Sequence, residues 1–326
     1  MHSTIRQRIS LPSQSSSTSQ PSTTTSDSAP LLQKAKAKAA KVRALLLFTE
    51  LPEWAQDNEN IHTGFRPLTN SYWECIKSMS YMHNEAGNIY THLLAAIWMI
   101  ALGSWWSVYA KERYPGMGRE DDVVFFMFFL GGVVCYLLST TYHVLSNHSH
   151  ATHLFCLKLD FLGILIVTAG CFPPGLWYTF PCAETRTKVV WIGVDLTAQT
   201  IAAILALFST SFRAPKMQAL RGFVFSTMAS SAFFPIIIKI FQVGWTRANT
   251  EYGASSYIWT IIIYLSSVTV YALRITEKWK PGHFDLWGHS HQIFHVGMAV
   301  GLTAHFSAFV RAVHQFYGVK QGQCPD

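Results

Sequence analysis

The sequence predicts an all-α membrane protein, a bundle of seven transmembrane helices with a cytoplasmic N-terminus. Half of the 326 residues are hydrophobic and only 13% are charged, whereas soluble globular domains carry about 25% charged residues. Aromatic residues are abundant, with 11 Trp, 13 Tyr and 22 Phe. From residue 88 onward, seven apolar segments follow one another, each close to the length of about 20 residues that a bilayer core requires. These segments leave no room for a separate soluble fold.

The chain is expected to divide into four parts. Residues 1–45 are predicted to be a disordered tail, because 15 of the first 28 residues are Ser or Thr and a basic run follows them. Such a segment buries too little apolar surface to order itself. Residues 46–87 are expected to form a cytoplasmic juxtamembrane segment with a short helix between Ser71 and Tyr81. Residues 88–318 hold the seven-transmembrane domain, and residues 319–326 form a C-terminal tail.

Hydropathy places the seven spans at 88–110, 122–145, 154–178, 188–210, 221–244, 255–275 and 288–314. The third span is expected to end at Pro173-Pro174. Pro235 is expected to kink the fifth, because proline cannot donate the backbone hydrogen bond of a helix interior. The odd number of spans and the lack of an internal repeat argue against an inverted-repeat transporter.

The formal net charge of +7 is best explained by an anionic membrane surface, and nucleic acid is not expected as a partner. The basic residues lie mainly in the N-terminal tail and between the apolar runs. Lys and Arg in the loops number six on each side, so charge alone favours a cytoplasmic N-terminus only weakly. The six Cys include no CxxC pair. A Cys171–Cys182 disulfide is left open, since sequence alone does not fix pairing.

Four ionisable residues in the apolar spans are expected to meet near one membrane face. His143 ends the second span, Asp160 lies early in the third, and His291 and His295 open the seventh. The end of span two and the starts of spans three and seven face the same side of the membrane, whichever way the protein is inserted. His291 and His295 are four residues apart and share a helix face. Ionisable residues inside a membrane are costly and indicate function.

Three imidazoles at one depth favour a metal site, most simply zinc with a fourth position open to water. Asp160 could bind the metal directly or hold that water as a base. The alternative is that these four residues form hydrogen bonds between helices without a metal.

The other polar residues are expected to have no part in this site. His148, His150 and His153 are expected to be solvated, and His305 is expected to pack or hydrogen bond. Asp195 and Lys239 are expected to lie near the opposite membrane face, where they pair or snorkel.

An ordered set of motifs resembles the progestin and adipoQ receptor family, also called hemolysin III-related, over residues 48–318. The segment before the first span and the start of that span carry the first part of the resemblance: Leu51-Pro52-Glu53-Trp54, Asp57-Asn58, Ile61, Gly64-Phe65-Arg66, His83-Asn84-Glu85, Asn88-Ile89 and Thr91-His92. The later spans carry the rest: Ser139-x-x-x-His143, Leu159-Asp160-x-x-Gly163 and Ser290-His291-Gln292-Ile293-Phe294-His295. Fungal members, tied to zinc and sterol homeostasis, look most similar on overall impression.

The resemblance implies a cytoplasmic N-terminus and zinc held by His143, His291 and His295, with Asp160 holding the metal-bound water and Ser139 near the site. It also implies a link to ceramide hydrolysis. The function expected is a receptor-like protein of lipid signalling and zinc or sterol homeostasis, with Asp160 and Ser139 as the catalytic residues of a zinc-dependent lipid amide hydrolase. A receptor or metal sensor with structural zinc is the alternative, and a channel fits worst.

The partners expected are membrane lipids, ceramide or sterol-like, with an extracellular protein ligand left open. The expected location is the plasma membrane or an endomembrane. Zinc lowers the pKa of its bound water toward about 7, so the enzyme hypothesis needs no other cofactor.

Overall fold

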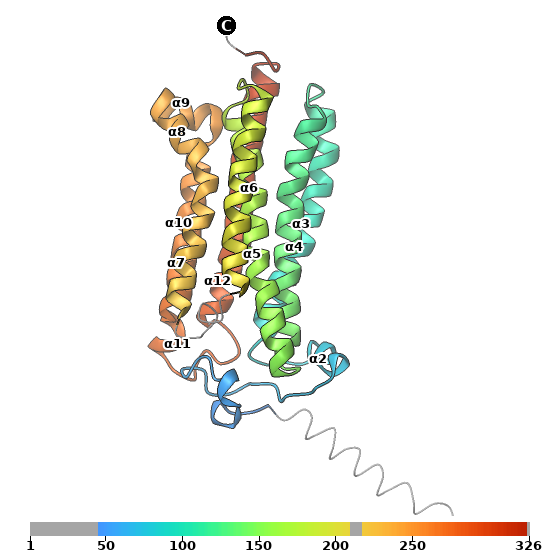
Figure 1. Cartoon of the computed structure of the whole chain (residues 1–326), viewed down its shortest axis with the longest axis vertical. Helices are drawn as coiled ribbons and strands as arrows, with labels where there is room; N and C mark the ends of the chain where they lie inside the picture. The colour runs from blue at the N-terminus through green and yellow to red at the C-terminus, as the bar shows by residue number, and fades with distance from the viewer. Residues whose placement is uncertain (1–44, 209–216, 325–326) are drawn as a thin grey trace, which may run out of the picture. The chain divides into compact units, whose positions relative to one another are not determined.

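The described part of the chain, residues 45–208 and 217–324 of a computed structural model, is helical, with a single isolated β-bridge between Leu46 and Phe65. Seven long helical segments form a bundle (Figure 1), as the sequence predicts. They are α3 (Ala86–Arg113), α4 (Arg119–Leu145), α5 (His150–Thr179), α6 (Thr185–Phe208), the pair α7 (Gln218–Ala229) and α8 (Phe234–Val243), α10 (Ala254–Leu273) and α12 (Ser290–Val313). The expected tail over residues 1–45 lies almost entirely outside the described residues.

Six of these segments are long and apolar enough to cross a membrane, judged over the described residues. The remaining long helix, α6, corresponds to the fourth predicted span and packs beside α5. Two short helices, α2 (Tyr72–Ser78) and α11 (Ile275–Trp279), lie at one end of the bundle, which we call the juxtamembrane end. The other end carries α9 (Trp245–Tyr252) and the C-terminus (Figure 1).

Local sequence explains the helix starts that matter for the site. The Ser71 hydroxyl accepts the backbone N–H of Glu74 at 3.4 Å and caps α2. The Ser149 hydroxyl accepts the N–H of Thr152 at 3.4 Å and caps α5. Because each cap satisfies a backbone donor that lacks an intrahelical partner, the short helix predicted between Ser71 and Tyr81 forms, and α5 begins one turn before its predicted span.

Small residues bring α4 and α5 together. A Cβ added at Gly170 would lie 2.6 Å from the carbonyl oxygen of Met127, and one at Gly131 would lie 3.2 Å from that of Ile166. A Cβ at Gly163 would lie 3.1 Å from the Cα of Cys135. Glycine permits such close approach between transmembrane helices. The pairing brings Asp160 of α5 to the cavity that Ser139 and His143 of α4 also line.

Proline has different effects in two helices. The expectation that the third span ends at Pro173-Pro174 is wrong, because α5 continues through both residues to Thr179. Pro173 and Pro174 are buried in the bundle, and prolines are tolerated inside transmembrane helices where the surroundings satisfy the freed backbone groups. Ahead of Pro235 the α-helix of the fifth span is interrupted, because residues Ser230–Phe233 form a 3₁₀ turn between α7 and α8.

A disulfide joins Cys182, in the α5–α6 connection, to Cys324 after α12. We call this the disulfide end of the bundle. Cys171 is a free, buried thiol of α5, so the pairing of Cys171 with Cys182 that the sequence left open is not formed. Cys324 lies near the C-terminus, and its approach to the α5–α6 connection depends on how α12 and α5 pack, which Cys spacing does not encode.

Candidate metal centre

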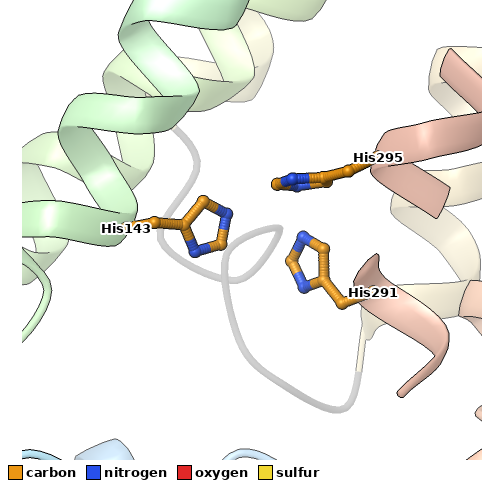
Figure 2. A group of neighbouring side chains, drawn as sticks. All are labelled: His143, His291 and His295. Atoms are coloured by element: carbon orange, nitrogen blue, oxygen red, sulfur yellow. The ribbon is translucent and has the colours of Figure 1, made fainter. Parts of the chain in front are cut away.

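Three imidazoles converge at the juxtamembrane end, as Figure 2 shows. His143 comes from the last turn of α4, and His291 and His295 from the first turns of α12. One ring nitrogen from each lies within 4.8 Å of the others. The ring centroids are 4.7 to 5.0 Å apart. His143 and His295 are buried and His291 is half-buried. These three residues, which we call the histidine triad, were predicted to meet, and the structure brings them together.

Hydrogen bonds orient two of the rings. Nδ1 of His143 is 2.7 Å from Oε2 of Glu85, and Nδ1 of His295 is 3.2 Å from the carbonyl oxygen of Asn88. Since an ionised carboxylate and a carbonyl only accept hydrogen bonds, each Nδ1 carries the hydrogen and each Nε2 keeps its lone pair. Nε2 of His143 is buried and has no hydrogen-bond partner among the described residues.

These features fit a zinc ion. Zinc–nitrogen bonds of about 2.0–2.1 Å in a tetrahedron place ligand nitrogens roughly 3.4 Å apart, a spacing that small side-chain rotations reach from the distances observed. Ligating histidines usually donate their other ring N–H to a carboxylate or a backbone carbonyl, as His143 and His295 do here. The triad supplies three protein ligands, the number found in catalytic zinc sites with an open position.

Glu85 is one of two residues beside the triad that sequence reasoning from the polar spans missed. It immediately precedes α3, and its Oε2 also accepts a hydrogen bond of 2.7 Å from the Asn88 amide. Burial raises the pKa of its carboxyl, but the His143 imidazole and the Asn88 amide outweigh burial, so the pKa lies well below its usual value. Glu85 therefore contacts His143 from outside the group of three ring nitrogens.

His92 is a fourth imidazole beside the triad. Its ring stacks on that of His295, with centroids 3.5 Å apart and planes 6° from parallel. Both of its nitrogens are buried without a hydrogen-bond partner in the described part of the chain. The signal for both missed residues is positional: the start of the first span faces the same side as the starts of spans three and seven.

The predicted catalytic residues line the cavity but stand outside the triad. Asp160 is half-buried and is absent from the group of ligand atoms that meet within 4.8 Å. The Ser139 side chain is buried and lines the same cavity. The arrangement gives no support to Asp160 as a direct ligand and leaves its carboxylate facing the cavity.

The other polar residues singled out in the sequence lie elsewhere. His150 is exposed, as expected, with its ring stacked on Trp54. His153 and His148 are half-buried against Trp54 and Tyr72, so these two are not simply solvated. His305 is buried against Phe233, Tyr257 and Phe309. The Lys239 ammonium lies over the rings of Phe180 and Tyr252, and among the described residues it forms no ion pair with Asp195.

A cavity of about 530 Å³ connects the triad to the apolar interior. Its walls come from the juxtamembrane segment and from α4, α5, α7, α10 and α12, and it reaches from Trp54 at one end to Phe233 and His305 at the other. Its volume falls in the range of about 300–1,000 Å³ typical of ligand sites. The cavity is lined largely by apolar residues and holds the imidazoles of the triad in its wall.

The juxtamembrane segment is fixed over this cavity by polar contacts. Asn58 donates to Oε1 of Glu277 at 3.0 Å, and Oδ2 of Asp285 accepts the N–H of Thr63 at 2.8 Å. Burial raises the pKa of Glu277, but hydrogen bonds from the hydroxyl and the N–H of Ser290 outweigh it and lower the pKa below its usual value. Glu277 thus caps the start of α12 at Ser290, which is the residue before His291.

Arg66 connects the juxtamembrane segment to the end of α4, which carries His143. Its buried guanidinium donates to Ser78 at 2.7 Å, to the carbonyl of Val144 at 3.0 Å and to the carbonyl of His143. Burial lowers the pKa of Arg66, and the facing Glu85 opposes that shift. The contacts fix the last turn of α4, from which His143 projects.

Known proteins are similar to this chain in sequence. Residues 80–306 match the family described as haemolysin-III related. The chain is 32% identical to the adiponectin receptor protein of Drosophila melanogaster and 33% identical to progestin and adipoQ receptor-like protein 1 of Caenorhabditis elegans, over 85% and 80% of its length. It spans only 61% and 59% of those relatives.

A fungal relative is matched over most of both chains. The ADIPOR-like receptor IZH1 of Eremothecium gossypii is 30% identical over 82% of this chain and 84% of its own length. The match includes the helices that carry the histidine triad, since the family region runs from before α3 into α12. This chain is therefore a multi-pass membrane protein that belongs to the haemolysin-III-related family of adiponectin receptor-like proteins.

Proposed function

We propose that the histidine triad holds zinc and that the chain is a receptor-like protein of lipid signalling and zinc or sterol homeostasis, with zinc-dependent hydrolysis of lipid amides such as ceramide as its activity. The observation that carries the proposal is the position of the triad at the polar end of a lipid-sized cavity. The similarity to adiponectin receptor and IZH-type relatives supports a receptor-like role.

The chemistry divides between the metal and the chain. Zinc supplies a Lewis acid that polarises a carbonyl and makes water a good nucleophile near neutral pH. The residues of the chain orient the reactants: Glu85 and the Asn88 carbonyl hold the two imidazoles, and the cavity wall holds the acyl chain.

Asp160 is assigned as the base of this reaction. It takes a proton from the attacking water and returns one to the amide nitrogen as the C–N bond breaks, which leaves a fatty acid and an amine. Ser139, whose buried side chain lines the cavity, donates a hydrogen bond to the substrate carbonyl. General base catalysis contributes typically about 10²–10⁴-fold in rate.

We propose a cytoplasmic N-terminus and a C-terminus that faces the lumen or the outside, in the plasma membrane or an endomembrane. The Cys182–Cys324 disulfide supports this orientation, because disulfides persist in oxidising compartments and are rare in the cytosol. The proposed partners are ceramide-like or sterol-like lipids, and an extracellular protein ligand is a further candidate.

The test compares zinc content with lipid hydrolysis in the same purified samples. Wild type is expected to contain about one zinc per chain, the number that one three-imidazole site holds. His291→Ala and His295→Ala are expected to lose most of it, and His314→Ala, an exposed imidazole near the C-terminus, is expected to keep it. Full zinc retention in both triad variants would contradict the site.

Asp160→Asn separates an enzyme from a zinc-stabilised receptor. Asn keeps the shape of the side chain and removes its ability to accept a proton. The enzyme assignment predicts normal zinc content with hydrolysis of ceramide-like amides reduced by about 10²–10⁴-fold, measured against metal-free His295→Ala as the background. If wild type hydrolyses no faster than that background, the structural-zinc receptor is the correct function. If Asp160→Asn matches wild type, Asp160 is not the base.

A further inference from the structure

One imidazole in the interior of the bundle has no hydrogen-bond partner. His305 of α12 is 1% exposed, and both of its ring nitrogens are fully buried and unpaired among the described residues. A neutral imidazole has one N–H to donate and one lone pair that accepts. Because buried polar groups almost always bond to protein or to ordered water, a ring with two unpaired nitrogens points to a ligand or a water that binds there.

Aromatic rings hold the His305 side chain in place. Its ring lies nearly parallel to that of Phe233, with centroids 5.4 Å apart and planes 10° from parallel. The rings of Tyr257 and Phe309 lie 5.1 and 4.7 Å away. The Tyr257 hydroxyl is hydrogen-bonded to Thr179 instead. The packing thus fixes the imidazole without satisfying it.

His305 lines the same cavity as the histidine triad. The cavity wall from α12 includes His291, His295, Met298, Leu302 and His305. With 3.6 residues per turn, the first of these and the last three lie within about 60° of one another around the helix. One face of α12 is therefore polar at both ends and apolar between them.

The separation of the two polar ends suits a fatty acyl chain. His305 follows His295 by ten residues, which corresponds to about 15 Å along the helix axis. That is half of the hydrocarbon core of about 30 Å, the depth that the chains of one leaflet fill. A long chain that is extended along Met298 and Leu302 reaches farther, so it passes His305 before its terminal methyl.

Two cavity-lining hydroxyls beyond the triad already donate their hydrogens to helix carbonyls. Ser230 belongs to the same 3₁₀ turn as Phe233, and its hydroxyl donates to the Ser226 carbonyl at 2.8 Å. The Thr168 hydroxyl donates to the Leu165 carbonyl at 2.9 Å. His305 differs from both, because its donor and its acceptor are unused among the described residues.

We propose that the cavity takes a fatty acyl lipid with a hydroxyl group along the middle of its chain, and that His305 recognises this hydroxyl. A hydroxyl both donates and accepts, so it complements the imidazole in either tautomer, whereas a plain hydrocarbon chain bonds to neither nitrogen. The inference rests on the proposed function in one respect, that the carbonyl end of the lipid lies at the triad. His305 determines specificity and takes no part in bond cleavage.

The test is competition for bound, labelled oleic acid on the purified full-length protein in detergent. Ricinoleic acid has the chain and double bond of oleic acid and adds a mid-chain hydroxyl. Wild type is compared with His305→Phe, which keeps an aromatic ring and removes both nitrogens. The affinity for ricinoleic acid relative to oleic acid is expected to fall about 5-fold in the variant, the value of one hydrogen bond. Since partition into detergent is the same for both proteins, this comparison cancels it.

Two controls accompany the comparison. Met298→Leu changes the same cavity wall without a change in ring nitrogens, so it is expected to keep the wild-type ratio of the two affinities. In wild type, ricinoleic acid is expected to bind more tightly than oleic acid hydroxylated beside its carboxyl group, an isomer of the same polarity. This second comparison needs no variant, and it decides the question if His305→Phe does not fold.

The outcomes separate this inference from the proposed function. If both acids bind but their affinity ratio is the same in wild type and His305→Phe, water is the partner of His305 and the inference is wrong, while the lipid site remains. Equal binding of the two hydroxylated isomers by wild type would lead to the same conclusion. If neither oleic nor ricinoleic acid binds, the proposed lipid function is wrong and this inference is wrong with it.

Discussion

His143 is held both at its ring and at its backbone. Its ring donates to Glu85, and its backbone carbonyl accepts from Arg66. Such contacts decide which nitrogen faces the cavity, because the hydrogen on Nδ1 leaves Nε2 as the only lone pair. The residue-scale design is therefore one in which charged groups outside the triad fix the ligand before any metal binds.

Glu85→Gln tests this design. The amide can still accept a hydrogen bond from Nδ1 but carries no negative charge, and loss of such outer contacts typically weakens metal affinity by about 10–100-fold. We expect zinc affinity, measured by competition with a chelator, to fall within that range while the protein stays folded. Glu74→Gln, which neutralises a partly exposed carboxylate of α2, should bind zinc like wild type. Unchanged affinity in Glu85→Gln would show that the contact is not needed for binding.

The histidine triad could be predicted from the sequence, but the residues that orient it, Glu85 and Arg66, could not be predicted from hydropathy. Counting membrane crossings places His143, His291 and His295 at one end whatever the details of packing, and the spacing of four puts two of them on one helix face. Glu85 and Arg66 lie before the first span, where apolar periodicity carries no signal. Their roles depend on how the juxtamembrane segment folds back under α4, which is a matter of tertiary contact rather than of pattern.

Helices α4 and α5 depend on their glycines at the element scale. Gly170→Ala places a methyl 2.6 Å from the Met127 carbonyl, so the two helices must separate. Overpacking of this kind costs typically about 1–3 kcal/mol, and we expect a lower Tm for the purified protein. Gly193→Ala in α6 is the matched control, because a Cβ there meets no atom within 4 Å and alanine favours the helix. Equal Tm values for the two variants would argue against the close packing.

The spans themselves were predictable because a run of about 20 apolar residues is the length of a membrane-spanning helix and is rare elsewhere. The interruptions were not equally predictable. Pro173 and Pro174 leave α5 helical, whereas the fifth span changes to a 3₁₀ turn just before Pro235. Proline is buried in both cases, so neither the residue type nor its burial decides whether the helix is interrupted.

The orientation of the whole molecule can be tested without a tag at the disulfide end. Cys182 and Cys324 form the disulfide, and the other four cysteines are buried. In sealed microsomes, whose outer face is cytoplasmic, we expect a membrane-impermeant maleimide added after an impermeant reductant to label nothing until detergent opens the vesicles. An N-terminal tag should be removed by protease before that point.

The double variant Cys182→Ser, Cys324→Ser is the control for this experiment and should stay unlabelled in open vesicles. Labelling of wild type in sealed vesicles would reverse the proposed orientation. The grouping of the histidines at one end would remain, because the number of crossings between them does not change.

The last helix is anchored at both of its ends. Glu277 binds the start of α12 through Ser290, and beyond its far end the chain is joined to Cys182 by Cys324. Anchored at both ends, α12 forms a fixed wall of the cavity. If the cavity widens to admit a lipid, we expect the α7–α8 segment to move, because its 3₁₀ turn at Ser230–Phe233 interrupts the helix. Helix α12 and the α10 helix packed against it would then stay in place.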